Sequence, residues 1–151
     1  VYGENMGWEH VIPEFLTRVI RLGKNTTDPI PFPIQGSGKE TRSFVYIDDF
    51  IDGVMLLLAK GEHLGIYHIG TREELAMEQV AHAVAHALGR KIRVIPGTLA
   101  SGGTLRRCPD IGKMNALGYK PKFLLQQALP AVARWYLQNI DLAPSNEGKV
   151  P

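Results

Sequence analysis

The sequence predicts an α/β fold in which a small mixed β-sheet is flanked by helices. From Ile34 onward, short β-branched or aromatic runs alternate with stretches whose apolar residues recur at helical spacing. The connections between these runs are short, and the chain holds no internal repeat. Because 44% of the 151 residues are hydrophobic, the chain is long enough to enclose one core. We expect a single domain over residues 1–140, followed by a flexible, polar tail over 141–151.

The first third of the chain predicts one helix and two strands. Over His10–Leu22 the apolar residues follow helical spacing with arginines on the other side, and Gly23 is a typical stop signal. A proline-rich stretch then leads to a short strand at Ile34–Gln35 and to a Gly-Ser-Gly turn over 36–38. The aromatic and β-branched run Phe44–Ile47 is predicted to be the second strand.

A second helix is predicted at Phe50–Lys60. Its apolar residues cover a wide face, which is typical of a helix that is buried on more than one side. Asp48 or Asp49 can cap its start, because a carboxylate accepts hydrogen bonds from the free N–H groups there and lies at the positive end of the helix dipole.

The rest of the chain continues the alternation of strands and helices. Asp110 is a candidate cap for a short helix that Gly118 ends, and Pro130 lies inside the last helix, where it can introduce a kink. The predicted elements are a strand at Gly65–Gly70, a helix at Met77–Leu88, a strand at Lys91–Ile95, a short helix that ends at Leu117, and a helix at Phe123–Asn139.

Composition narrows the classes of partner and compartment. The formal net charge of +2 comes from mixed, dispersed charges, so we expect neither nucleic acid nor a membrane surface as a partner. No apolar run approaches the ~18 residues that span a bilayer. Cys108 is the only cysteine and cannot form an internal disulfide. A lone cysteine fits a reducing compartment, and we expect a cytoplasmic protein.

Two groups of residues resemble reactive sites but are predicted to be incidental. His82 and His86 are four residues apart with Glu78 one turn earlier, but the zinc-protease pattern requires a glutamate beside the first histidine. They also lie opposite the apolar stripe of their helix, so we predict a solvated face and no metal site. Cys108 has two neighbouring arginines but no nearby histidine to act as a base, which favours an incidental thiol.

Three arginines are better candidates for ligand binding. Arg42, Arg106 and Arg107 lie at junctions between a loop and a regular element. Guanidinium groups bind phosphate oxygens through paired hydrogen bonds, and two such junctions can hold a diphosphate between them. From composition alone, the alternative that all three are exposed surface arginines is equally open.

The motifs resemble those of a known family when they are taken in order. The order is YG, HVIPEF, the Gly-Ser-Gly turn, TRSFVYIDDFIDG, YHIG and RRCPDIGKMNALGYKP. Over Val1–Asn139 the chain resembles the C-terminal, substrate-binding lobe of the extended Rossmann-type short-chain dehydrogenase/reductases. These are the NAD-dependent nucleotide-sugar epimerases, dehydratases and decarboxylases. The resemblance implies a nucleotide diphosphate sugar as the ligand.

The resemblance also implies roles for particular residues. The arginine after the glycine turn, Arg42, and the arginine before Pro-Asp, Arg107, bind the diphosphate in the family, with Arg106 as a further candidate. Asp48 and Asp49 are implied to be a helix cap and a structural anchor. The remaining candidates are His10 and Val11 beside the phosphates and ribose, and Pro33, Ile34 and Gln35 beside the base.

The catalytic features of the family are absent from this sequence. No tyrosine is followed four positions later by lysine, and the turn over 36–38 lacks the third glycine of a dinucleotide-binding loop. The sequence does not begin with Met, and we expect a piece of a longer polypeptide whose Rossmann half, in cis or in trans, binds NAD and performs catalysis. We expect no cofactor and no catalysis for this chain alone.

Alternatives remain open at this point. A stand-alone nucleotide-binding or interaction module without catalysis would have the same sequence features, and the chain could form a homo-oligomer through apolar surface that a missing half leaves exposed. The motifs do not distinguish epimerase from dehydratase or decarboxylase, nor do they name the sugar or the base.

Overall fold

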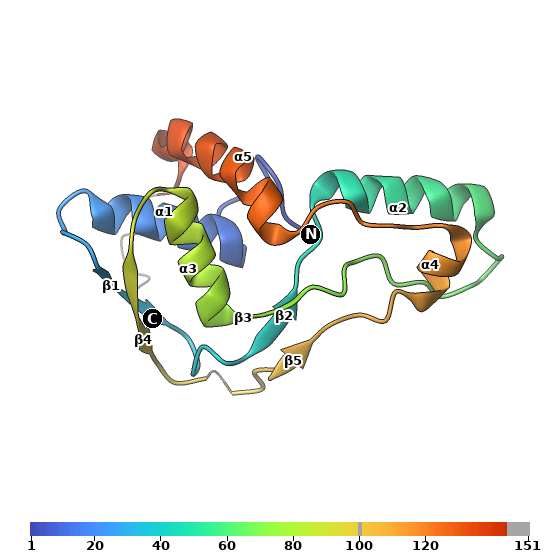
Figure 1. Cartoon of the computed structure of the whole chain (residues 1–151), viewed down its shortest axis with the longest axis horizontal. Helices are drawn as coiled ribbons and strands as arrows, with labels where there is room; N and C mark the ends of the chain where they lie inside the picture. The colour runs from blue at the N-terminus through green and yellow to red at the C-terminus, as the bar shows by residue number, and fades with distance from the viewer. Residues whose placement is uncertain (100, 145–151) are drawn as a thin grey trace.

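Five α-helices and five short strands make up the described part of the chain (Figure 1). The structure is a computed structural model that describes residues 1–99 and 101–144. The predicted tail begins in a single 3₁₀ turn, η1 (Ile140–Leu142), and its residues 145–151 lie outside the described residues. The helices are α1 (Val11–Gly23), α2 (Ile47–Lys60), α3 (Met77–Ala87), α4 (Gly112–Leu117) and α5 (Leu125–Gln138). The strands are β1 (Ile30–Ile34), β2 (Thr41–Ser43), β3 (Glu74–Ala76), β4 (Ile92–Pro96) and β5 (Arg106–Arg107).

The strands form two small sheets. β1 pairs in parallel with β4, and Ile30 lies opposite Ile92. In the second sheet β2 is central, with β3 antiparallel on one side and β5 parallel on the other. The predicted α/β class with small mixed sheets and flanking helices is confirmed.

The main core lies where α1, α3 and α5 pack against one another and against the sheet of β1 and β4 (Figure 1). Phe15 of α1 meets Phe32 of β1 edge to face, with ring centroids 5.3 Å apart. Tyr136 of α5 fastens the N-terminal loop, because its hydroxyl donates to the carbonyl of Gly7 (2.9 Å) and accepts from the N–H of Met6 (3.2 Å). The N-terminal loop, α1 and α5 are distant in the sequence but therefore pack in one core.

A smaller apolar cluster joins α2 to α4. Ile111, Met114 and Tyr119 are buried there against partly buried side chains of α2. Gly53 of α2 allows a close approach, since a Cβ at this position would lie 2.6 Å from the side chain of Ile69. None of the described helices is long and apolar enough to cross a membrane.

Two of the strand predictions are misplaced by a few residues. Phe44–Ile47 is not a strand; β2 ends at Ser43 and α2 already begins at Ile47. Among the described residues, the chain between them forms one isolated parallel bridge, between Tyr2 and Tyr46. The strand expected at Ile34–Gln35 is instead β1, over Ile30–Ile34. Its two prolines are typical of a loop, but here their side chains are exposed on an edge strand. An edge strand tolerates proline because one of its sides needs no backbone donor.

The strand predicted at Gly65–Gly70 is wrong for the described chain. These residues have no strand assignment, and the only strand between α2 and α3 is β3. Their β-forming side chains are not enough, because a strand requires a partner to satisfy its backbone groups.

The predictions for α2 are also wrong in two respects. Tyr46 is the N-cap and no side chain caps the helix, while Asp48 and Asp49 lie in the first turn. Burial on more than one side is contradicted, since Ile51 and Met55 remain 50% and 61% exposed.

The prediction of a cap for the short helix α4 is also wrong. Its N-cap is Ile111 instead of Asp110, although the Asp110 carboxylate accepts the N–H of Gly112 (2.8 Å).

Asp49 is the anchor that joins α2 to the segment before α5. Its side chain is 1% exposed, and its carboxylate oxygens accept the N–H groups of Lys122 (2.9 Å) and Phe123 (3.0 Å). A buried carboxylate is tolerated only where such donors replace water. The anchoring role that the family resemblance implied for this pair of aspartates therefore falls to Asp49.

We expect Asp49→Ala to lower the free energy of unfolding by about 1–3 kcal/mol, because it leaves two N–H groups without their acceptor. Asp48→Ala is the matched control, since Asp48 lies in the same helical turn but is exposed. Urea unfolding of the two variants measures the difference. Equal stability would contradict the anchoring role.

Candidate functional site

Arg42 and Arg107 come together through the pairing of β2 with β5. The two residues are register partners in parallel strands, so their side chains project from the same face of the sheet. One guanidinium nitrogen of Arg42 donates to the carbonyl of Thr104 (2.7 Å), and one of Arg107 donates to the hydroxyl of the same residue (3.2 Å). The two junctions that the sequence singled out therefore meet at Thr104.

Neither of these guanidinium groups is neutralised by a carboxylate among residues 1–99 and 101–144. Arg42 is half-buried and makes its remaining bond to the carbonyl of Thr41 (2.7 Å), and Arg107 is exposed. Two like charges that share a neighbour repel each other, and an anion placed between them would remove this repulsion. The arrangement suits a ligand with several phosphate oxygens.

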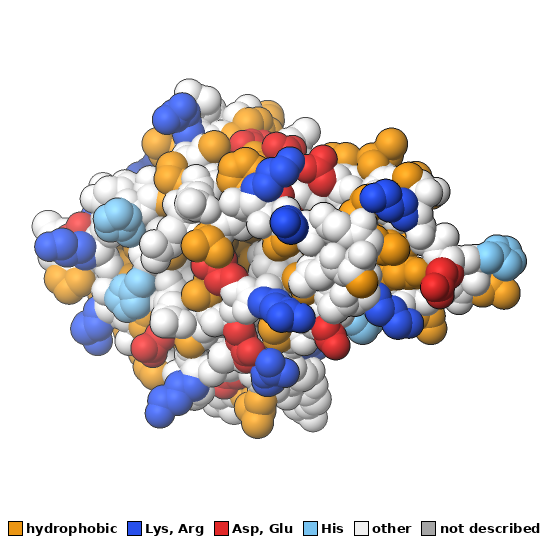
Figure 2. All heavy atoms as spheres, turned by 45° about the vertical axis from the view of Figure 1, so that its right-hand side comes forward, with side chains coloured by type: hydrophobic (Ala, Val, Ile, Leu, Met, Phe, Trp, Pro, Cys, Tyr) orange, Lys and Arg blue, Asp and Glu red, His pale blue; other side chains and the backbone are white. Residues whose placement is uncertain are grey.

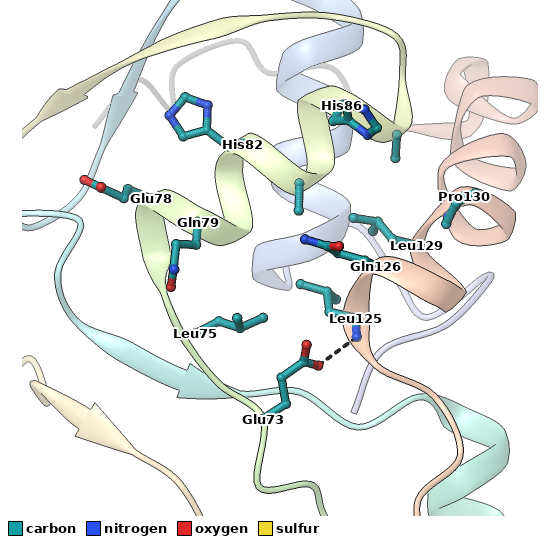
Figure 3. Close-up of a pocket in the computed structure, with 12 residues that line it drawn as sticks. Glu73, Leu75, Glu78, Gln79, His82, His86, Leu125, Gln126, Leu129 and Pro130 are labelled. Carbon is teal, nitrogen blue, oxygen red and sulfur yellow. Dashed lines mark hydrogen bonds between the residues drawn. The ribbon is translucent and has the colours of Figure 1, made fainter.

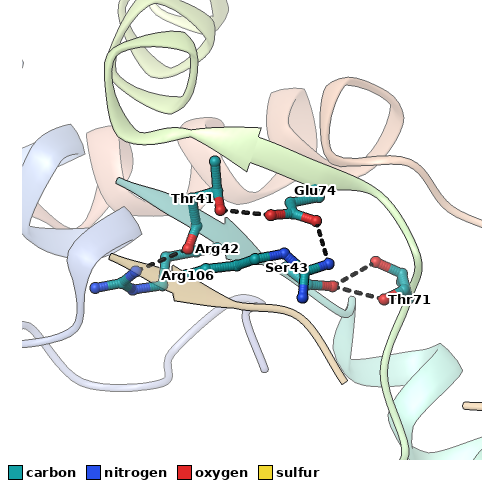
Figure 4. A network of polar contacts seen from close by, with 6 residues as sticks. All are labelled: Thr41, Arg42, Ser43, Thr71, Glu74 and Arg106. Carbon is teal, nitrogen blue, oxygen red and sulfur yellow. Dashed lines mark hydrogen bonds and ion pairs between the residues drawn. The ribbon is translucent and has the colours of Figure 1, made fainter. Parts of the chain in front are cut away.

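Arg106 lies on the opposite face of the sheet. Its guanidinium forms an ion pair with the carboxylate of Glu74 at 2.7 Å, pointing away from the guanidinium of Arg42 (Figure 4). A hydrogen bond from Thr41 and the bond from Arg106 hold the pKa of Glu74 below its usual value, and the same ion pair raises the pKa of Arg106. Arg106 is thus separated from the other two arginines, and its ion pair with Glu74 links β5 to β3 across β2.

The turn that precedes β2 is held by a buried carboxylate, that of Glu40. One oxygen accepts the N–H and the hydroxyl of Ser37 (both 3.0 Å), and the other accepts the N–H of Gly38 (2.9 Å). Gly36 has a φ of +81° and lies against the carboxyl group, where a Cβ would approach to 2.8 Å. The largest cause that lowers the pKa of Glu40 is the hydrogen bond from the backbone N–H of Ser37, followed by a bond from the backbone of Glu40 itself. The hydroxyl of Ser37 and the N–H of Gly38 lower this pKa further.

The same turn also begins α3. The carbonyl of Glu40 accepts the N–H of Met77 (2.9 Å), and the carbonyl of Gly38 accepts the N–H of Glu78 (3.0 Å). The carboxylate of Glu40 thus binds N–H groups of the turn, and carbonyl groups of the turn bind the first N–H groups of α3. A dinucleotide loop needs such N–H groups free for phosphate, so this turn does not fit NAD.

The residues implied to approach the base lead directly into this turn. Pro33 and Ile34 are the last residues of β1, and Gln35 follows them. Ile34 is 3% exposed and belongs to the core, whereas Pro33 and Gln35 are exposed. Two of the three therefore have side chains that a ligand could contact.

His10 and Val11 lie at the start of α1. His10 is the N-cap, is exposed and makes no side-chain capping bond. Both residues line a small crevice of about 20 Å³ together with Phe44, which follows Arg42 by two residues. The start of α1 is thereby brought next to the segment that carries the candidate arginine.

A larger hollow than this crevice lies elsewhere, between α3 and α5 (Figure 3). It measures about 630 Å³ and contains none of the predicted site residues. The carboxylate of Glu73 at its base accepts the N–H of Leu125 (2.7 Å). His82, His86 and Glu78 are exposed along its α3 side. In the described part of the chain no three His, Cys, Asp or Glu side chains gather as metal ligands would.

Residues that the sequence motifs do not single out support the arginines. Glu40 was passed over, although an acidic residue two positions after a Gly-x-Gly turn is a detectable signal for a carboxylate that binds the turn's N–H groups. Thr104 and Glu74 could not be found in this way, because only the pairing of β2 with β3 and β5 brings them to the arginines.

The comparisons with known proteins agree with the motif order. Residues 1–70 match the NAD dependent epimerase/dehydratase family. A solved dTDP-glucose 4,6-dehydratase, DesIV from Streptomyces venezuelae with NAD and TYD bound, is 32% identical and superposes with a TM-score of 0.76 over 94% of this chain. The chain belongs to the NAD-dependent epimerase/dehydratase family.

Other members of this family extend the comparison. Putative GDP-L-fucose synthase 2 of Arabidopsis thaliana is 28% identical over 93% of this chain, and UDP-glucuronic acid decarboxylase 4 of the same plant is 34% identical over 73% of it. This chain covers 43% and 25% of those two proteins and 42% of the dehydratase. It therefore spans less than half the length of each of these family members.

We expect Glu40→Gln to destabilise the chain at neutral pH by about 1.5–3 kcal/mol, the value of a hydrogen bond to a charged group. Because the folded pKa of Glu40 lies below the ordinary value of 4.5, its stabilisation is complete above that value and is lost as the pH falls through the folded pKa. The gap in unfolding free energy between wild type and variant should therefore narrow as the pH falls below the ordinary value of 4.5 and through the folded pKa. Urea unfolding at several pH values measures the gap, and a constant gap would contradict the charged role.

Proposed function

We propose that this chain is the nucleotide-sugar-binding part of an NAD-dependent epimerase, dehydratase or decarboxylase whose catalytic half lies outside it. The observation that carries the proposal is the pairing of Arg42 with Arg107. Both guanidinium groups converge on Thr104 from one face of the sheet, with no carboxylate partner in the described chain. This arrangement suits a diphosphate, since each arginine can bind one phosphate.

The surroundings support a nucleotide at this position. Pro33, Ile34 and Gln35 run from β1 into the turn that Glu40 holds, and they are proposed to contact the base. His10 and Val11 are proposed to approach the ribose and phosphates from the start of α1. Arg106 is proposed to act mainly by fixing β5 through Glu74, because its charge is already paired.

Turnover would need groups that this sequence does not contain. The family transfers hydride to NAD and uses a tyrosine whose proton transfer is assisted by a lysine four residues later, and no such pair is present. The Gly-Ser-Gly turn does not suit the dinucleotide, because its N–H groups are bound by Glu40. NAD is therefore assigned to the other half of the parent enzyme.

A stand-alone nucleotide-binding module is the second candidate. The absence of the catalytic pair favours it equally, and the two candidates differ only in whether a catalytic half works with this chain. Titration calorimetry with UDP-, dTDP-, GDP- and CDP-sugars identifies the ligand in either case. Product formation when a catalytic half is supplied decides for the enzyme.

We expect Arg42→Ala to weaken binding of the best nucleotide sugar roughly ten- to a hundred-fold, the equivalent of one charge-assisted hydrogen bond of ~1.5–3 kcal/mol. Lys39→Ala is the control, because Lys39 is an exposed cation in the adjoining turn, and it should cost under about 1 kcal/mol. Calorimetry measures both. Equal affinity of wild type and Arg42→Ala, with folding unchanged, would make the arginine a structural residue.

The effect of Arg107→Ala should resemble that of Arg42→Ala. If both arginines hold one diphosphate, the double variant should lose less than the sum of the two single losses. Arg106→Ala should affect unfolding more than affinity, since it breaks the ion pair with Glu74. Strictly additive losses for Arg42 and Arg107 would indicate separate sites.

We expect the purified chain alone to bind NAD weakly and to convert no nucleotide sugar. The reason is that the dinucleotide loop and the tyrosine–lysine pair are both missing from the sequence. Fluorescence titration with NADH and chromatography of sugar-nucleotide products are the measurements. Tight NADH binding or any product from the chain alone would overturn the assignment of NAD to another half.

A further inference from the structure

The hollow between α3 and α5 has the form of a small-molecule pocket. Its volume of about 630 Å³ lies within the range of ~300–1,000 Å³ that is typical of such pockets. Leu125 and Leu129 are buried and Leu75 is half-buried, so leucines form its floor. Its polar lining residues are Glu73, Glu78, Gln79, His82, His86 and Gln126. An apolar floor with polar groups around it suits an amphipathic ligand.

The charged side chains of this lining are carboxylates. Among the described residues that line the hollow there is no lysine or arginine, although these outnumber acidic residues in the chain by 17 to 15. Neither Glu73 nor Glu78 has an ion-pair partner within residues 1–99 and 101–144. Figure 2 shows histidine side chains at the surface over α3, to the left of the view. The lining therefore complements a positively charged group.

Glu73 is held in place at the base of the hollow. One of its carboxylate oxygens accepts the N–H of Leu125 (2.7 Å). The other oxygen has no hydrogen-bond partner among the described residues, and Figure 3 shows it directed between Leu75 and Leu125. An acceptor that is already fixed loses little conformational freedom when a ligand binds. This oxygen is therefore suited to receive an N–H donor from a cation.

The form of the hollow favours a small molecule over a protein partner. Protein interfaces are centred on large apolar side chains that bury themselves in the partner. Here the rim carries exposed polar side chains such as Glu78, Gln79 and His82, and the leucines lie beneath them. Such a rim can form hydrogen bonds but offers little apolar area to a broad surface.

We propose that the hollow binds a small amphipathic cation. Its ammonium group is held by the free oxygen of Glu73, with Glu78 as the second negative charge, and its apolar body rests on Leu75, Leu125 and Leu129. The site is separate from the two candidate arginines, which do not line the hollow. The proposal does not rest on the proposed function.

The test titrates the whole ¹⁵N-labelled chain at neutral pH with tryptamine and with phenethylamine, and follows the amide signals by NMR. The matched controls are indole-3-propionate and 3-phenylpropionate, in which a carboxylate replaces the ammonium group. Both amines should bind in the millimolar range or tighter and should shift the Leu125 amide signal. The two acids should bind at least about tenfold more weakly, because their charge repels that of the lining.

Three variants locate the binding. Glu73→Gln keeps an acceptor for the Leu125 N–H but removes the charge, and should weaken both amines about tenfold or more. Glu62→Gln is the matched control, an exposed acidic residue outside the hollow that should leave their affinity unchanged. Ala83→Leu enlarges a half-buried side chain of the lining and should also weaken binding, because it fills the hollow.

Equal binding of amines and acids would overturn the proposal, as would a Leu125 signal that neither amine shifts. Unchanged affinity in both Glu73→Gln and Ala83→Leu would do the same, and Ala83→Leu decides alone where Glu73→Gln does not fold. Self-association that Ala83→Leu abolishes would assign the hollow to a second copy of the chain.

The nucleotide sugars separate this proposal from the proposed function. Arg42→Ala should weaken nucleotide-sugar binding and leave the affinity for tryptamine unchanged, because Arg42 does not line the hollow. Displacement of tryptamine by a saturating nucleotide sugar would place the amine at the arginines and overturn the proposal. Tryptamine binding by a chain that binds no nucleotide sugar would support the hollow as a site and refute the proposed function alone.

Discussion

The carboxylate of Glu40 is the point on which the candidate site depends. It binds the N–H groups of Ser37 and Gly38 and so fixes the turn between β1 and β2. Because this turn sets where β2 begins, it also sets the register that places Arg42 opposite Arg107. The carboxylate also occupies N–H groups of the turn that the phosphates of a dinucleotide would need, so one buried charge both directs Arg42 and disfavours a dinucleotide at this turn.

Much of the fold could be predicted from local patterns. The helices around Phe15, Val84 and Trp135 were placed correctly because an amphipathic stripe is encoded within the helix itself. The two arginine junctions were also identified, since each follows a recognisable turn. That Arg42 meets Arg107 while Arg106 meets Glu74 could not be predicted, because strand register between distant segments decides which face each side chain occupies.

The errors have a common physical origin. Phe44–Ile47 and Gly65–Gly70 have strand-forming side chains, but a strand exists only where a neighbouring backbone completes its hydrogen bonds. The expected burial of α2 on more than one side depends likewise on neighbours. No part of residues 1–99 and 101–144 covers the side of α2 that carries Ile51 and Met55. A cap at Asp48 or Asp49 was expected from the local pattern, whereas the carboxylate of Asp49 accepts the N–H groups of Lys122 and Phe123, about seventy residues away in the chain.

The bonds between the turn and α3 have a mechanical consequence. The carbonyls of Gly38 and Glu40 hold the first N–H groups of the helix, so the turn and the helix start cannot shift separately without breaking these bonds. Glu78 and His82 lie on that helix beside the hollow that faces α5. A displacement of the turn that keeps these bonds therefore requires the start of α3 to move with it, and the start of α3 forms part of the wall of that hollow.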